Sequence, residues 1–344
     1  MFGRMLFVGL STNDRGIIKK LVLDCHVGGL TLYSRNYRNY DEMLNLINYI
    51  HSLAEEAGYT IFIGIDEEGY RVNRLPKEIK NLKSPYFFHH NLDFIKKHGE
   101  IIATILSKSN ININFAPVLD IKRFPDNHPI GDRCFGDNAS VVIKNTLPYI
   151  KEFQNKKVIP VVKHFPGHGA TKINSHYFIP IIWNTKKLIK EDITPFKEAI
   201  NHSCDAIMVG HFLIPKVTFL TPTSFAKKTV LFLRNNLNFS NLIVTDDIHM
   251  GLLKLANKAK IIKKAINSGF NMIMVKYDDK FFKDYQKLQK YNNQNKLNQA
   301  NINQSIKLID SLIQKYHITN QPVTNTLDIN KINEEITKLN QYTN

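Results

Sequence analysis

The chain has 344 residues, of which 43% are hydrophobic and 22% are charged, so it is long enough to bury one large core. Its formal net charge of +16 would suit a nucleic acid or another polyanion as partner. The lysines and arginines are scattered, however, with no dense basic run and no interleaved aromatic residues, so we expect no nucleic-acid partner.

The cysteines and the hydropathy bound the cellular context. Cys25, Cys134 and Cys204 lie far apart and form no CxxC pair, which excludes a disulfide framework and favours a reducing compartment. The apolar stretch Met1–Leu10 is too short for a signal peptide, and no run reaches the roughly 18 apolar residues of a membrane span. We therefore expect a cytoplasmic protein with no membrane partner.

Short apolar, β-branched runs recur along the chain and are separated by longer segments. Near-continuous apolar runs, rather than strict alternation, are typical of parallel strands that are covered on both faces. These runs are predicted to be strands: Met5–Leu10, Gly29–Tyr33, Thr60–Ile65, Ile111–Ala116, Val158–Val162, Ala206–Val209, Leu242–Val244 and Met272–Val275.

The intervening segments have helical character. Asn91 is suited to cap the helix that follows it, and Pro148 predicts a helix that is kinked or starts late. After Tyr316 the chain turns polar, and we expect a mobile tail with a short helix near Lys331–Leu339. The predicted helices cover residues 13–23, 40–57, 91–107, 139–153, 185–200, 224–237, 252–267 and 306–316.

This alternation predicts an α/β fold: a (β/α)8 TIM-type barrel in a single domain over residues 1–317, followed by a polar C-terminal tail over 318–344. An open doubly wound sheet is the alternative. A barrel places its active site at the carboxyl ends of the strands. Ionisable residues follow five predicted strands and so indicate a catalytic mouth: Asp66, Lys163 with His164, His211, Asp246 and Lys276.

The segment 161–180 leaves a strand and continues as a long polar loop that contains His164, His168 and His176. A metal site is one interpretation of three histidines. Their spacing matches no standard ligand set, so we expect no metal ion. Hydrogen-bond anchoring of the loop is the structural alternative, and it suits His168 best.

Several ordered motifs resemble the bacterial β-N-acetylglucosaminidases of glycoside hydrolase family 3. The segment Lys163–Gly169, KHFPGHG, is the most specific of them. Seven motifs in the same order make a chance similarity implausible, and together they cover roughly residues 5 to 316. The other segments that resemble the family are VGGLTLYSRN (27–36), IDEEGYRVNRL (65–75), FAPVLD (115–120), Asp132-Arg133, DAIMVGH (205–211) and VTDDIHM (244–250).

The resemblance implies a catalytic pair. Asp246 corresponds to the nucleophile, which would form a covalent glycosyl-enzyme and give net retention. A helix N-cap is the structural alternative for Asp246, although Asp247 is better placed for that role. His176 corresponds to the general acid/base, and a histidine titrates near neutral pH.

The resemblance also implies a sugar-binding set that holds the N-acetylglucosamine ring. Charged donors and acceptors at strand ends suit sugar hydroxyl groups. For Asp66 the structural alternative is an ion pair with Arg74 or Lys163, and Asp120 is expected to support the site. The implied substrate-binding residues are Asp66, Arg74, Arg133, Lys163 and His164.

One position departs from the family pattern. The family has Asp two residues before the catalytic His, where it is inferred to orient the imidazole, and this chain has Asn174. We expect an active enzyme with a lower rate or a shifted pH preference, in which Asn174 acts with His176. The alternative is a catalytically silent homologue that binds N-acetylglucosamine or muropeptides.

The family further implies the substrate. Its members are expected to remove terminal β-1,4-linked N-acetylglucosamine from anhydro-muropeptides during peptidoglycan recycling. The resemblance implies no metal or organic cofactor. We expect a monomer whose partner is its muropeptide substrate.

Overall fold

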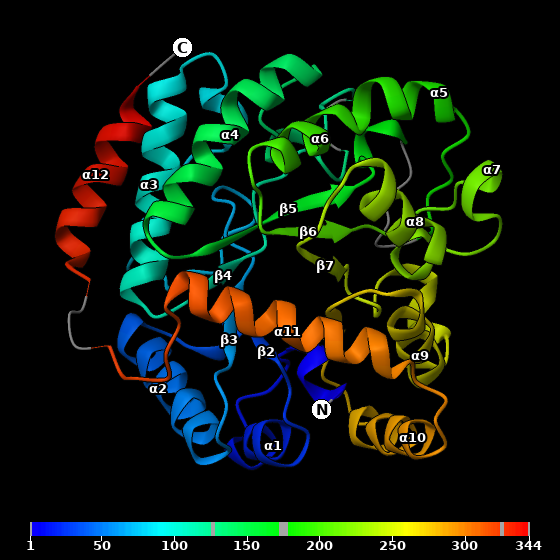
Figure 1. Ribbon diagram of the computed structural model, residues 1–344. Helices are drawn as coiled ribbons and strands as arrows, with labels where there is room; N and C mark the ends of the chain where they lie inside the picture. The colour runs from blue at the N-terminus through cyan, green and yellow to red at the C-terminus, as the bar shows by residue number, and fades with distance from the viewer. Residues whose placement is uncertain (1, 125–127, 172–177, 324–326, 343–344) are drawn as a thin grey trace.

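Eight parallel strands form the centre of the computed structural model, which describes residues 2–124, 128–171, 178–323 and 327–342 (Figure 1). Each strand overlaps a run predicted from the sequence, and nearly all strand residues are buried. The strands are β1 (Leu6–Gly9), β2 (Gly29–Leu32), β3 (Phe62–Ile65), β4 (Ile113–Asn114), β5 (Ile159–Phe165), β6 (Ala206–Val209), β7 (Leu242–Thr245) and β8 (Ile273–Lys276).

The sheet closes on itself. Its strands follow the order β7-β6-β5-β4-β3-β2-β1-β8, so the chain order is interrupted only where β8 pairs with β1. The two ends of this order meet at the bridge between Val244 and Met272, where Thr245 N donates to Met272 O at 3.0 Å. The expected (β/α)8 barrel is therefore confirmed, and the open doubly wound sheet is excluded.

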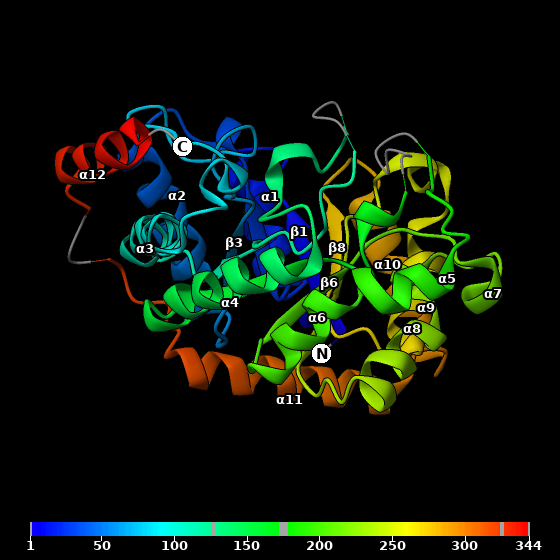
Figure 2. The same ribbon diagram turned by 90° about the horizontal axis from the view of Figure 1, so that it is seen from above.

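Helices surround the barrel and cover its outer face (Figure 2). Most overlap the predicted segments, although several are shorter than expected or end in a π-helical turn, and α11 begins seven residues before the predicted start at 306. None of the described helices is both long enough and apolar enough to span a bilayer. The helices are α1 (Arg15–Lys19), α2 (Tyr40–Glu56), α3 (Leu92–Lys108), α4 (Ala139–Asn155), α5 (Thr185–Lys187), α6 (Thr194–Asn201), α7 (Pro215–Thr218), α8 (Lys227–Leu231), α9 (Lys258–Ser268), α10 (Phe281–Asn293), α11 (Gln299–Tyr316) and α12 (Ile329–Gln341).

Two local signals in the sequence had different outcomes. The Asn91 side chain accepts hydrogen bonds from the N–H groups of Asp93 and Phe94, which confirms the predicted cap of α3. Pro148 does not delay α4, which runs without interruption from Ala139 to Asn155. The helix tolerates this proline because it buries Tyr149, Phe153 and other apolar residues of the same face.

The C-terminal segment corrects the expectation of a mobile tail. The predicted short helix exists and is longer, as α12, and it lies beside α3 in both ribbon views (Figures 1 and 2). It buries Ile336 fully, and Glu335 pairs with Lys97 of α3 at 2.7 Å. Apolar burial and this ion pair hold α12 against the barrel.

The helix α10 covers a segment for which the sequence predicts no helix.

The barrel interior is filled by a large side chain that two glycines accommodate. Phe7 of β1 is fully buried and meets Phe115 edge-on, with ring centroids 5.2 Å apart. A Cβ atom at Gly29 or Gly64 would lie only 2.5 or 2.7 Å from the Phe7 ring. Strands β2 and β3 therefore need glycine at these two positions, and the barrel is a packed core that directs polar side chains to its rim.

Candidate active site

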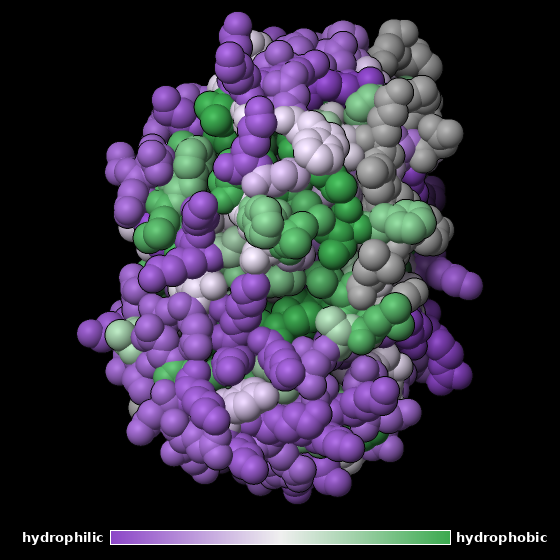
Figure 3. Space-filling model, turned by 90° about the vertical axis from the view of Figure 1, so that its right-hand side faces the viewer, coloured by the Kyte–Doolittle hydropathy of each residue, from purple (hydrophilic) through white to green (hydrophobic). Residues whose placement is uncertain are grey.

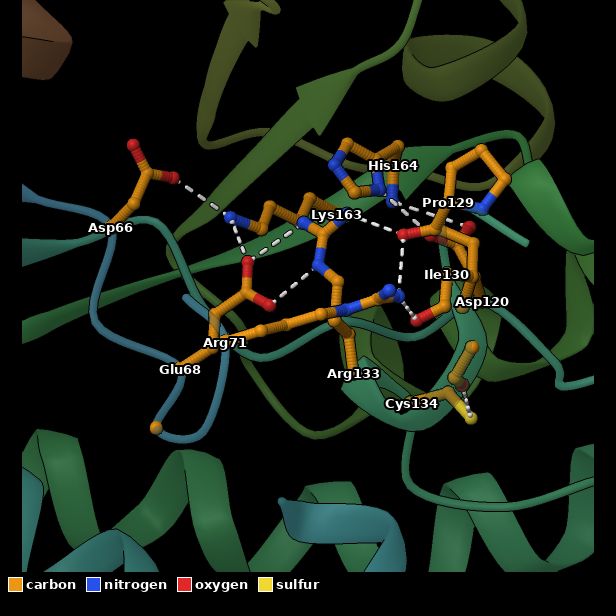
Figure 4. A network of polar contacts seen from close by, with 12 residues as sticks. Asp66, Glu68, Arg71, Asp120, Pro129, Ile130, Arg133, Cys134, Lys163 and His164 are labelled. Atoms are coloured by element: carbon orange, nitrogen blue, oxygen red, sulfur yellow. Dashed lines mark hydrogen bonds and ion pairs between the residues drawn. The ribbon is translucent and has the colours of Figure 1, made fainter. Parts of the chain in front are cut away.

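The carboxyl ends of β3, β4 and β5 bring polar side chains together (Figure 4). Asp66 directly follows β3, Asp120 lies shortly after β4, and Lys163 and His164 belong to the carboxyl end of β5. Arg133 comes from the connection after β4, on a single 3-10 turn. The sequence predicted that strand ends would supply this site, and parallel strands place their carboxyl ends on one rim of the barrel.

Glu68 links two predicted sugar-binding cations. Lys163 Nζ lies 2.8 Å from Asp66 Oδ1 and 2.6 Å from Glu68 Oε1. Arg133 grips the same Glu68 carboxylate with Nε and Nη2, each at 2.8 Å. Glu68 and Lys163 side chains are 3% exposed, whereas Asp66 is 25% exposed. Asp66 is therefore the member of this network that is most open to a ligand.

The network is charged at neutral pH. Burial alone would raise the pKa of Glu68, but the charges of Arg133 and Lys163 outweigh it and hold that pKa well below its usual range. Burial would lower the pKa of Lys163, and the carboxylates of Asp66 and Glu68 raise it instead. Each buried charge is thus compensated by an opposite charge within hydrogen-bond distance.

Arg71 holds the segment that carries Arg133. Its Nη2 atom donates to the main-chain oxygens of His128, Pro129 and Ile130, at 3.2, 3.0 and 2.7 Å (Figure 4). Because one guanidinium binds three successive carbonyls, the loop from β3 and the connection after β4 are fastened together. This explains how Arg133, far from any strand, is positioned against Glu68.

Asp120 orients His164 and the loop behind it. Its Oδ2 lies 2.7 Å from His164 Nδ1, and its Oδ1 accepts the main-chain N–H of His168 at 2.6 Å. Burial would raise the pKa of Asp120, but His164 and His168 together lower it. Since Asp120 holds Nδ1, the other ring nitrogen of His164 is the one left for a ligand.

We expect Asp120→Asn to lower kcat/KM by on the order of 10²-fold, because a small misplacement of a binding group costs that much. The amide can accept only through one oxygen, so either the His164 ring or the His168 N–H loses its partner. Steady-state kinetics with a chromogenic N-acetylglucosaminide would measure the effect. Asp132→Asn, which removes only an ion pair with Lys122, is the matched control and should retain activity. Equal kcat/KM for both variants would contradict this role.

Asp246 stands at the end of β7, where it is partly exposed. Burial would raise its pKa, but His211, His164, the Asp247 N–H and Lys163 together lower it. Its Oδ1 accepts the Asp247 N–H at 2.8 Å. Asp246 is therefore an ionised carboxylate close to the His164 and Lys163 end of the network, as a nucleophile requires.

A second group of side chains fixes the backbone around Asp246. His211, after β6, contacts the Asp247 main-chain oxygen through Nε2 at 2.8 Å, and Nδ1 lies 2.5 Å from Ser224 Oγ. A carbonyl oxygen only accepts, so Nε2 carries a proton. His249 Nδ1 receives the main-chain N–H of Lys276 at 3.2 Å. The ends of β6, β7 and β8 are thereby joined around the Asp246–Asp247 turn.

Arg74 has few partners in the described part of the chain. Its Nη1 donates to Asn73 O at 3.3 Å, and its buried Nε makes no hydrogen bond there. Its main chain is held firmly, because Arg74 N donates to Glu67 Oε2 at 2.7 Å and Tyr37 Oη donates to Arg74 O at 2.6 Å. Burial raises the pKa of Glu67 to about 8. Arg74 is thus a fixed residue whose guanidinium retains donors for an anionic or hydroxyl-rich ligand.

The predicted residues divide into three groups, and Arg74 forms one by itself, because its guanidinium makes no hydrogen bond or ion pair with the others among the described residues. Asp66, Arg133, Lys163 and His164 come together with Glu68 and Asp120, and Asp246 lies near them. His176 and Asn174 lie outside the described residues. Sequence reasoning assigned no role to Glu68, and it placed His211 at the catalytic mouth without identifying its contact with the Asp247 main chain. Among the described residues no group of three or more His, Cys, Asp or Glu could hold a metal ion.

Comparisons with known proteins agree with this geometry. Residues 3–312 match the family described as "Glycosyl hydrolase family 3 N terminal domain". The chain is 28% identical to the beta-hexosaminidase A of Pseudoalteromonas piscicida over 87% of its own length, but it spans only 55% of that protein. It is 29% identical to the beta-hexosaminidase of Hydrogenovibrio crunogenus, covering 75% of this chain and 74% of that one.

Among solved structures, the chain is similar to a glycoside hydrolase family 3 beta-N-acetylglucosaminidase from Paenibacillus sp.. The two share 26% sequence identity with a TM-score of 0.89, and the match covers 98% of this chain and 67% of that one. The barrel and its strand order are thus those of a known enzyme fold.

Proposed function

The chain belongs to glycosyl hydrolase family 3, and from this premise we propose that it is a retaining exo-β-N-acetylglucosaminidase. The observation that carries the proposal is an ionised, partly exposed Asp246 beside the Asp66–Lys163–His164 cluster. We further propose that the substrate is a terminal β-1,4-linked N-acetylglucosamine of anhydro-muropeptides, in cytoplasmic peptidoglycan recycling, and that a monomer without cofactor performs the reaction. The relatives named beta-hexosaminidase support the sugar class.

The reaction divides into two displacements. The Asp246 carboxylate attacks the anomeric carbon, the glycosidic C–O bond breaks, and the leaving oxygen takes a proton from His176. Water then gives a proton to His176 and attacks the anomeric carbon, and the ester to Asp246 breaks. Two inversions return the original configuration. The low pKa of Asp246 keeps the nucleophile ionised at neutral pH.

The predicted sugar-binding residues differ in how available their polar atoms are to a ligand. Asp66 presents a partly exposed carboxylate, and His164 and Arg74 retain ring and guanidinium nitrogens for hydroxyl groups. Arg133 is 14% exposed and already engages Glu68 and the Pro129 main-chain oxygen. We therefore assign substrate contact chiefly to Asp66, Arg74 and His164, while Lys163 and Arg133 fix the Asp66 position and the local charge.

The enzymatic proposal is tested by turnover of p-nitrophenyl N-acetyl-β-glucosaminide by the purified chain. The released sugar, followed by NMR before it mutarotates, is expected to be the β-anomer. An α-anomer would contradict retention. A matching p-nitrophenyl β-glucoside, which lacks the acetamido group, is expected to be a much poorer substrate.

Asn174→Asp is expected to raise kcat at neutral pH by up to about 10⁴-fold, the cost of the reverse change in a serine protease. A carboxylate at this position would accept the imidazole N–H of His176 and stabilise its protonated form. The measurement is kcat across pH 5 to 9 for both proteins. Asn174→Ser, which supplies no charge, is the control. If the Asp variant gains nothing over Asn174, the role assigned to this position is wrong.

The alternative, a silent binding protein, is favoured by one observation, the Asn at position 174. It predicts micromolar binding of N-acetylglucosamine with no turnover and no covalent adduct. Labelling by a 5-fluoro-N-acetylglucosaminyl fluoride distinguishes the two, because only a working Asp246 forms the adduct.

A further inference from the structure

Two segments on one side of the barrel lack acidic residues. Between residues 206 and 245 the sequence contains no Asp or Glu, and the same holds between residues 178 and 190. The helices of these segments, α5, α7 and α8, lie on the same side of the molecule in both ribbon views (Figures 1 and 2). Glu191, the first acid after the second segment, pairs with Arg123 at 2.8 Å.

This side of the molecule also exposes large apolar side chains. Figure 3 looks onto it and shows a field of apolar residues in the middle of a hydrophilic surface. Phe219 and Leu220, just after α7, are 73% and 74% exposed, and Trp183 is 68% exposed. An apolar field of this kind marks a binding surface on a soluble domain. The apolar surface that we define here consists of Trp183, Ile189, Val217, Phe219, Leu220 and Leu231.

The stability of the fold does not explain the conformation and exposure of Phe219, which lies at the tip of this surface. Phe219 has φ 53° and ψ −124°, in a region that glycine adopts readily and bulky residues rarely do. Its side chain gains little from burial, because it points largely into solvent. An aromatic residue in a strained and exposed position therefore indicates a use outside the fold of the chain.

A groove connects the apolar surface to the active-site strand. It is lined by Ile189, Val217 and Phe232 together with Phe165 and Pro166, and has an empty volume of about 460 Å³. Phe165 is the last residue of β5, directly after His164. Whatever covers the apolar surface thus also lies close to the strand that supplies Lys163 and His164.

Exposed lysines frame the apolar surface. Lys216 belongs to α7, Lys227 and Lys228 to α8, and Lys186 to α5, and all four are exposed. None of these four forms an ion pair with another described residue, and Lys228 also lines the groove. Long lysine side chains beside apolar residues can extend their charge to a headgroup while their stems cover apolar surface.

We propose that this surface docks on an anionic lipid membrane, with Phe219 and Leu220 inserted at the level of the headgroups. Exposed apolar side chains at a loop tip, framed by lysines without ion pairs and drawn from segments that contain no Asp or Glu, are complementary to such a bilayer. A second copy of the chain is a poorer fit, because a twofold interface would oppose the lysines to themselves. This docking is peripheral and differs from the expectation of no membrane partner, which rested on the lack of a spanning run; the described helices contain no spanning segment.

The test is sedimentation with vesicles of phosphatidylcholine alone or with about one third phosphatidylglycerol. We expect binding to the anionic vesicles only, weakened by salt. Phe219→Gly/Leu220→Ser should lose binding by at least about 10-fold, because both apolar anchors are removed. This variant relieves the strained φ at position 219, so unchanged or higher thermal stability would show that it folds.

Charge is tested with two matched double variants. Lys227→Gln/Lys228→Gln should weaken binding to the anionic vesicles by about 30-fold. Lys331→Gln/Lys338→Gln removes the same charge from α12, on the opposite side in Figure 1, and should have little effect. An equal loss of vesicle binding in both double variants would show that binding depends only on net charge, and it would overturn the proposal. Failure of the wild-type chain to bind anionic vesicles at low salt would also overturn it.

Association of the chain with itself would also overturn the proposal. Sedimentation velocity without lipid would detect a dimer that Phe219→Gly/Leu220→Ser dissolves, and this outcome would assign the surface to a second copy. Hydrolysis of a small soluble glycoside is expected to be the same in all these variants, since none of the changed residues belongs to the site. Docking therefore succeeds or fails independently of the proposed enzymatic activity.

Discussion

Asp246→Asn is expected to lower kcat for glycoside hydrolysis by more than about 10³-fold, since removing the nucleophile of a covalent mechanism has effects of this size or larger. The Asn side chain has nearly the same shape as Asp but cannot form the glycosyl ester. The substitution also removes the negative charge that interacts with His211, His164 and Lys163. The measurement is the burst and steady-state release of p-nitrophenol, with mass spectrometry of protein treated with a 5-fluoro glycosyl fluoride.

The matched control for this prediction is Asp278→Asn. Asp278 also lies at the carboxyl rim, after β8, but it pairs with His249 Nε2 at 3.2 Å and is 43% exposed. It should keep most of the activity. A labelled wild-type protein whose adduct maps to Asp247 or Asp278 would contradict the assignment of Asp246, as would an Asp246→Asn variant of undiminished rate.

Glu68→Ala is expected to lower the free energy of unfolding by about 3 to 5 kcal/mol, the usual effect of removing one partner from a buried ion pair. The change leaves Lys163 and Arg133 close together with one carboxylate, Asp66, in place of two. Their mutual repulsion is then uncompensated in a site where both side chains are largely buried. Urea denaturation followed by circular dichroism at pH 7 would measure the loss.

The lowered pKa of Glu68 determines how the effect of Glu68→Ala on stability changes with pH. The pKa of Glu68 is lower in the folded than in the unfolded chain, so its contribution is present above the unfolded value of about 4.3 and lost as the pH falls. The difference in stability between wild type and Glu68→Ala should therefore stay constant from pH 7 to about pH 5 and shrink at lower pH. Asp66→Asn, on the more exposed partner, should cost less stability but weaken sugar binding. A difference that grows in acid would exclude a charged Glu68.

The sequence predicted the barrel well because its strands are buried on both faces. Such strands appear as short, β-branched apolar runs between longer helical segments, and all eight runs overlap strands. Caps such as Asn91 are equally local, since the side chain binds N–H groups two and three residues away.

The prediction from Pro148 was wrong because burial of the apolar face of α4 outweighed the free-energy cost of a proline inside the helix. The helix α10 buries only Phe281, Tyr285 and Leu288, too sparse a pattern to be recognised.

The candidate site was accessible to sequence reasoning only as separate motifs. Strand ends identified Asp66, Lys163, His164 and Asp246, because the rim of a barrel is fixed by its topology. The sequence could not show that Glu68, rather than Asp66 alone, neutralises Lys163 and Arg133, since Arg133 lies 65 positions from Glu68 and Lys163 lies 97 positions from Asp66. Ion pairing depends on distances of a few ångströms, and only the packing of the three loops on one rim decides them.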